Sequence, residues 1–180
     1  MKVSALCGSL RKGSFNQALL DTAIERGRSF GLEIVQGPID DFGLFCQEHE
    51  SNPPASVIEA KRIIQASSCL LLSTPEHNFG VPGVLKNAID WLSRPYGDPT
   101  LDHRRLALMG ASTGYMGTMR AQLAWRQLWH FFHAPVFSEV EMTVSFAADK
   151  FADGRLVDPP MLEQLDRFLA ALNAWLESCD

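Results

Sequence analysis

The stretch GSLRKGSFN, residues 8–16, has the residue types of a phosphate-binding loop. Gly8 and Gly13 are separated by four residues, as in the loop that holds nucleoside triphosphates, but Ser14 stands where that loop requires lysine. The dinucleotide fingerprint G-x-G-x-x-G also fails, because residue 10 is leucine. Hydroxyl groups, one guanidinium and the N–H groups at a helix start favour a single phosphate monoester instead.

Within this stretch, Ser9, Arg11 and Ser14 would form the anion cage, with Arg11 replacing both the missing lysine and a metal ion. Each residue also has a structural explanation. Ser14 and Gln17 match a capping box, Arg11 could be a solvated loop residue, and Asn16 an ordinary polar residue of the first helical turn. Their combination at the end of the first expected strand favours phosphate binding.

The run TPEHNFGVPGVLKNAIDWL contains a second loop, residues 74–82, in which proline and glycine delay the next helix until Val84. Such a loop can lie against a flat ring and offer it N–H groups. A plain strand-to-helix connection is the alternative, but it does not explain the aromatic pair His77 and Phe79.

A third loop, residues 111–118, is rich in small and polar residues. Ser112, Thr113 and Gly114 could bond the polar edge of a heterocycle, because small residues allow close approach. A glycine-rich helix entry is the alternative interpretation.

The elements that would position these loops alternate between strands and helices. The strand candidates are KVSALCGS, LEIVQGP, SCLLLSTP, RRLALMGAS and PVFSEVEMTV, and helical patterns cover about 15–28, 54–66, 84–93, 117–133 and 160–177. This alternation predicts an α/β fold, a flavodoxin-like, doubly wound, five-stranded parallel sheet with helices on both faces. We expect residues 1–180 to form one domain. Ligands of such sheets bind beyond the carboxyl ends of the strands, so the three loops should meet there.

The composition is that of a globular protein, with 46% apolar and 21% charged residues. A net charge of −5 argues against a nucleic-acid surface. The chain shows neither a signal-peptide pattern nor an apolar run of about 20 residues. The four cysteines form no metal-binding spacing. We therefore expect a cytoplasmic protein with no nucleic-acid partner, membrane contact or bound metal.

Three stretches together carry a family resemblance: GSLRKGSFN, TPEHNFGVPGVLKNAIDWLSRP and GASTG followed by RAQL. Over about residues 2–145, the chain resembles the NADPH-dependent FMN reductase family. The resemblance implies a flavodoxin-like fold, tightly bound FMN, NADPH or NADH as electron donor, and a homodimer or homotetramer. It also implies a small-molecule electron acceptor such as a quinone, a flavin, chromate or an azo dye.

The resemblance also assigns site residues. Ser9, Arg11, Ser14 and Asn16 would hold the FMN phosphate and the adjoining ribityl chain. Pro75, Glu76, His77 and Asn78 would lie along the isoalloxazine, and Ser112, Thr113 and Gly114 would meet its pyrimidine edge. The chain departs from the family pattern at His77, where tyrosine is usual, and near Tyr115, where arginine is frequent.

The expected activity is a ping-pong cycle in which FMN carries electrons from NAD(P)H to the acceptor, and no side chain is assigned as a catalytic acid, base or nucleophile. The main alternative is a flavodoxin-type electron carrier, which Arg11 and the modest net charge disfavour. A flavin-free signalling receiver would need an acidic pocket where Cys7 and Thr74 stand. A plain flavin-binding scaffold is a third possibility.

The expectation of an oligomer also rests on two helices that carry more large apolar residues than one core face needs. These are Val84, Leu85, Ile89, Trp91 and Leu92 in the first, and Leu123, Trp125, Leu128, Trp129, Phe131 and Phe132 in the second. Exposed apolar patches of this kind commonly mark an interface.

Overall fold

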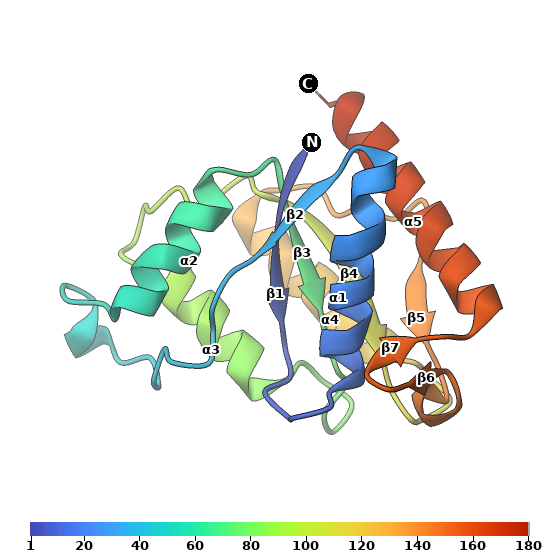
Figure 1. Ribbon diagram of the computed structural model, residues 1–180. Coiled ribbons are helices and arrows are strands. Elements are labelled where there is room, and N and C mark those ends of the chain that lie inside the picture. The colour runs from blue at the N-terminus through green and yellow to red at the C-terminus, as the bar shows by residue number, and fades with distance from the viewer. Residues whose placement is uncertain (180) are drawn as a thin grey trace.

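A computed structural model describes residues 1–179 of the chain. Five parallel strands form one sheet in the order β2-β1-β3-β4-β5, and Figure 1 shows them side by side. The strands are β1 (Lys2–Cys7), β2 (Glu33–Gln36), β3 (Cys69–Ser73), β4 (Arg105–Ala111) and β5 (Met142–Val144). This is the strand order of flavodoxin-like sheets, so the predicted fold class is confirmed.

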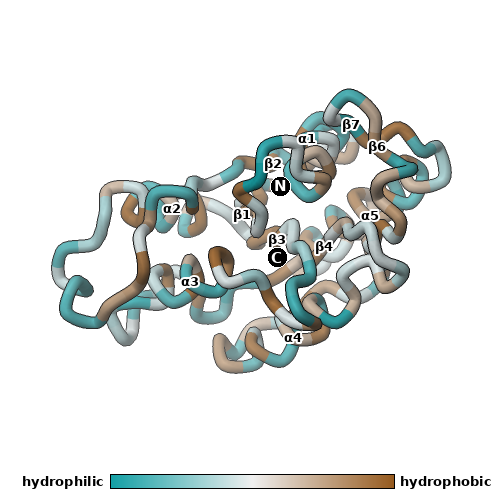
Figure 2. Tube along the Cα trace, turned by 90° about the horizontal axis from the view of Figure 1, so that it is seen from below, coloured by the Kyte–Doolittle hydropathy of each residue, from teal (hydrophilic) through white to brown (hydrophobic). Residues whose placement is uncertain are grey.

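Helices cover both faces of the sheet, as Figure 2 shows. One face carries α1 (Phe15–Gly27) and α5 (Pro159–Glu177), and the other carries α2 (Ala55–Gln65), α3 (Gly83–Leu92) and α4 (Met119–Trp129). Successive strand residues point to opposite faces, and each face therefore has its own apolar core. In β3, Leu71 belongs to the core under α1 and α5, whereas Leu70 and Leu72 belong to the other.

Short elements complete the chain. One-turn 3-10 helices cover Arg28–Phe30, Gln47–His49, His130–Phe132 and Ala147–Asp149. Two short strands, β6 (Phe151–Ala152) and β7 (Arg155–Leu156), pair as an antiparallel hairpin beside α1. The sequence reading missed this hairpin. No helix among residues 1–179 is long and apolar enough to cross a membrane.

Two element boundaries differ from the sequence prediction. The helix expected from residue 117 begins at Met119, because Gly117 and Thr118 have φ values of 54° and 78°, which a right-handed helix cannot use. The last strand is confined to Met142–Val144, and Val136 makes only an isolated bridge to Leu106.

The prediction that α3 and α4 expose surplus apolar surface was wrong for most of the residues named. Trp125 and Trp129 have no exposed surface, and Trp91 is 3% exposed. These rings fill the core between the helices and the sheet, together with Leu85, Ile89, Leu92 and Phe132. On and after α4, Leu123 and Phe131 remain exposed, at 59% and 68%.

Candidate functional site

The first loop leads from β1 directly into α1, and Ser14 is the last residue before the helix. The Ser14 Oγ accepts a hydrogen bond of 3.3 Å from the Gln17 N–H, which is the serine half of the expected capping box. The Gln17 side-chain amide pairs instead with that of Gln36. Gly13, with φ 69°, makes the turn before the cap. The N-terminus of α1 is thus presented at the end of β1, as an anion site requires.

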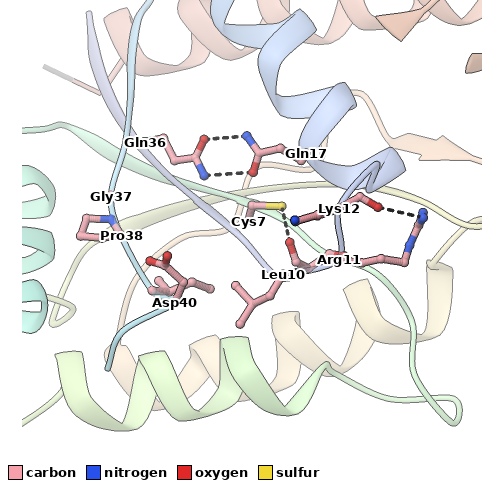
Figure 3. A pocket seen from close by; sticks show the side chains of 11 residues that line it. Cys7, Leu10, Arg11, Lys12, Gln17, Gln36, Gly37, Pro38 and Asp40 are labelled. Carbon is pink, nitrogen blue, oxygen red and sulfur yellow. Dashed lines mark hydrogen bonds between the residues drawn. The ribbon is translucent and has the colours of Figure 1, made fainter. Parts of the chain in front are cut away.

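Arg11 is exposed in this loop, and Ser9 is half-buried. The Arg11 guanidinium donates to the Lys12 carbonyl at 3.2 Å, as Figure 3 shows, and its Cζ lies 5.5 Å from the centroid of the Phe15 ring. The loop contains two basic side chains and no carboxylate. Its donors therefore match a dianionic phosphate monoester.

Asn16 ties the first loop to the third. Its buried side chain donates to the Ala111 carbonyl at 2.9 Å and accepts from the Ala111 N–H at 2.9 Å. The Ser73 Oγ, at the end of β3, donates to the Asn16 carbonyl at 2.8 Å. Asn16 thus holds the ends of β3 and β4 against α1. The sequence reading missed this role, because the partners are 95 residues apart.

The second loop contains a tight turn from His77 to Gly80. The backbone N–H and carbonyl of these two residues bond each other in both directions, at 3.1 and 2.9 Å. The central residues, Asn78 and Phe79, have φ values of 50° and 64°, the left-handed pair of a type I′ turn. A bulky residue such as Phe79 rarely adopts this conformation, so the turn is strained where it projects into solvent. His77 and Asn78 are exposed, whereas Pro75 is buried.

The Glu76 carboxylate caps α4, a helix that lies further along the chain. Its Oε2 accepts from the N–H groups of Arg120 and Ala121, at 3.0 and 3.4 Å, in the first turn of α4. Its Oε1 also pairs with the Arg120 guanidinium at 3.3 Å. The same guanidinium lies 4.0 Å from the centroid of the Phe79 ring. Glu76 and Arg120 therefore fix the second loop to α4, a role that the sequence reading missed.

The third loop exposes two of its three expected site residues, Thr113 and Gly114. The Ser112 Oγ accepts from the Gly114 N–H at 3.1 Å, which closes the loop on itself. The Tyr115 ring meets the Phe146 ring edge-on at 6.1 Å, and the two side chains are 76% and 49% exposed. An open aromatic pair thus borders this loop.

A cavity of about 300 Å³ borders the first loop on the side of β2. It is lined by Cys7, residues 9–12, Gln17 and residues 36–40, and Figure 3 shows Leu10 and Asp40 approaching from opposite sides. Of the expected site residues only Ser9 and Arg11 line this cavity. The second and third loops instead follow β3 and β4, on the other side of β1.

Cys7 lies at the base of this cavity, and burial raises the pKa of its thiol to about 11. The thiol therefore stays protonated at neutral pH and is a poor nucleophile. Within residues 1–179, no cluster of three or more His, Cys, Asp or Glu side chains could hold a metal ion.

The family model for NADPH-dependent FMN reductases matches residues 1–149 of this chain. The chain belongs to the NADPH-dependent FMN reductase family. It is 38% identical over 178 residues to an NAD(P)H-dependent FMN reductase of Pseudomonas aeruginosa, covering 98% of this chain and 95% of the relative. It is 37% identical to an NAD(P)H:quinone oxidoreductase of Solanum tuberosum, covering 97% and 92%.

Among solved structures, the chain resembles FerB, a flavoenzyme NAD(P)H:(acceptor) oxidoreductase from Paracoccus denitrificans. The TM-score is 0.89 at 30% identity, over 98% of this chain and 97% of FerB. The predicted family and its oxidoreductase class are therefore confirmed. As an FMN reductase, the chain uses FMN with NAD(P)H.

The residues of this FMN reductase fit that cofactor. The first loop offers hydroxyls, a guanidinium and a helix N-terminus to a terminal phosphate. Gly8 gives the end of β1 its close approach to the second loop, because an added Cβ would lie 2.9 Å from both Pro75 and Pro82. Residues 77–79 and 113–115, in the loops that follow β3 and β4, are exposed and so accessible to a bound ring.

Proposed function

We propose that this protein binds FMN noncovalently and uses NAD(P)H to reduce a quinone or a similar small acceptor at one site. The observation that carries the proposal is the first loop, whose donors suit one phosphate and which matches neither the triphosphate nor the dinucleotide motif. Relatives named as quinone reductases in Pseudomonas putida and Escherichia coli, each 33% identical, support a quinone acceptor.

The proposed cofactor residues fall into three groups. Ser9, Arg11 and Ser14 bind the phosphate, and Asn16 holds the helix start that faces it. Pro75, Glu76, His77 and Asn78 form the ring-side loop, in which Glu76 acts by anchoring the loop to α4. Ser112, Thr113 and Gly114 form the opposite loop. When bound, FMN supplies the electron-transfer chemistry, and the chain supplies binding and orientation.

The absorption spectrum of the purified protein tests this function. We expect a flavin spectrum, with FMN released by heat, that bleaches when NADPH or NADH is added without oxygen and recovers when a quinone follows. A protein that holds FAD, or that binds no flavin on reconstitution, would contradict the proposal. Bleaching by dithionite but not by NAD(P)H would assign the chain to the electron carriers.

His77 provides a test of how the ring-side loop acts. Its backbone, rather than its side chain, closes the turn with Gly80, so His77→Ala and His77→Tyr should both retain FMN. The exposed imidazole is a polar, hydrogen-bonding group beside the proposed position of the ring. We expect both variants to reduce quinone at a rate that differs from the wild-type rate, while FMN stays bound. Equal rates in all three proteins would assign the side chain to solvent.

We also propose that the protein is a homodimer or a homotetramer. Met119, Leu123 and Phe131 are 40%, 59% and 68% exposed and follow one side of α4 and the turn after it. Tyr115 and Phe79 of the candidate site are also exposed, and the Phe79 ring contacts the guanidinium of Arg120, the residue after Met119. An apolar stripe beside a site supports a two-fold interface.

Sedimentation at micromolar concentration tests the assembly. We expect a dimer or a larger species for the wild type and a smaller species for Leu123→Glu. Ile58→Glu is the matched control, because Ile58 is 57% exposed on α2, away from this stripe. A monomeric wild-type protein would refute the proposal.

We also propose that residues 1–180 form one FMN-binding domain, which the single five-stranded sheet supports. The protein acts in the cytoplasm, and its free thiols at Cys7, Cys46, Cys69 and Cys179 support a reducing compartment.

A further inference from the structure

The β6–β7 hairpin follows residue 149, where the match to the family model ends, and lies beside the start of α1. Figures 1 and 2 both show this arrangement. We propose that Phe151, in β6, is a positioning residue for Arg11, so that the hairpin is part of the FMN phosphate site. This inference rests on the proposed function of the first loop.

Three side chains form a continuous row from the loop to the hairpin. The Arg11 Cζ lies 5.5 Å from the centroid of the Phe15 ring, within the range of a cation–π contact. The Phe15 ring lies 5.2 Å from the Phe151 ring at an interplanar angle of 46°. Phe151 thus supports the ring against which the guanidinium rests.

Arg11 depends on this support because little else orients it. The side chain is exposed, and its hydrogen bond goes to the carbonyl of the next residue, Lys12, in the same loop. A free arginine side chain loses much rotamer freedom when it binds an anion. The Phe15 ring limits that freedom in advance, provided that the ring itself is fixed.

The hairpin can hold the Phe15 ring in place because the hairpin itself is anchored at both ends. Leu156 is 4% exposed and packs in the core under α1 and α5. The Val157 N–H donates to the Lys150 carbonyl at 2.9 Å, which closes the base of the hairpin. Directly afterwards, the Asp158 side chain caps α5 by accepting from the Met161 N–H at 3.2 Å.

The test compares FMN with riboflavin, which has the same ring and ribityl chain but no phosphate. Dissociation constants of both flavins are measured by titrating the apoprotein. Loss of an aromatic contact is expected to weaken FMN binding about 2- to 10-fold in Phe151→Ala. Riboflavin binding should not change, because the row acts only on the phosphate contact. Phe151→Tyr retains the ring and should restore FMN affinity.

Two further variants distinguish a role of Phe151 in positioning Arg11 from a general disruption of the hairpin. Val157→Ala alters an exposed side chain at the hairpin base and should change neither constant. In an Arg11→Ala background, Phe151→Ala should cause no further loss, because the group it positions is absent.

Two results would overturn the proposed role of Phe151, and a third would refute the proposed function. Equal FMN affinity in Phe151→Ala and the wild type would overturn the inference, as would equal losses for FMN and riboflavin. A wild-type protein that binds no FMN would instead refute the proposed function.

Discussion

Apoprotein carrying Arg11→Ala is expected to bind FMN about 10- to 150-fold more weakly than the wild type. The first loop has one guanidinium among its hydroxyl and N–H donors, and a hydrogen bond to a charged group contributes about 1.5–3 kcal/mol. Arg11→Lys should recover only part of the loss, because an ammonium is a point charge without the planar fork of arginine. Flavin fluorescence titration measures the three constants.

Lys12→Ala is the matched control, since it removes the same charge from the adjacent position of the same loop. Its effect should be smaller and should decline with salt, as for an unpaired surface charge. Unchanged affinity in Arg11→Ala would mean that Arg11 is a solvated loop residue.

Gly110→Ala is expected to produce the largest loss of stability. Gly110 is buried in β4, and an added Cβ would lie 2.2 Å from the Thr118 Oγ1 and 2.3 Å from the Thr74 carbonyl oxygen. The carbonyl belongs to the backbone and cannot turn away, so the strand must shift. Overpacking of this kind costs about 3 kcal/mol, which lowers the Tm of a chain of this size by about 6–12 °C.

The matched control is Gly83→Ala, because no atom lies within 4 Å of the position that its Cβ would occupy in the first turn of α3. Its stability should be unchanged or raised, since alanine favours a helix. Thermal and urea unfolding of the two variants measures the difference. Equal free energies of unfolding would show that β4 and the neighbouring loops can separate without cost.

The sequence was sufficient for the sheet and its helices because their signals are local. The strand candidate SCLLLSTP coincides with β3, which is buried along its whole length, and the helical pattern of residues 160–177 coincides with α5, which the Asp158 side chain caps. The first loop could also be interpreted locally, because one residue, Ser14, both replaces the lysine of the triphosphate loop and caps the helix that follows.

The hydrogen bonds that connect the loops could not be predicted from local sequence patterns. Glu76 caps a helix 44 residues further on, and no spacing along the chain indicates which helix end a carboxylate will reach. The same limit applied to Trp125 and Trp129, whose apolar character fits a core and an interface equally well. Only the packing against the sheet decided between them. The β6–β7 hairpin was missed because its strands have two residues each.

The bonds from Asn16 to Ala111 and from Ser73 to Asn16 have a kinetic consequence. They join the start of α1 to the ends of β3 and β4 before any ligand arrives, so flavin capture should not wait for the loops to assemble. The observed association rate should then rise in proportion to FMN concentration, in a single phase without a plateau. Variants of the phosphate loop should leave that rate nearly unchanged and differ mainly in how fast FMN leaves.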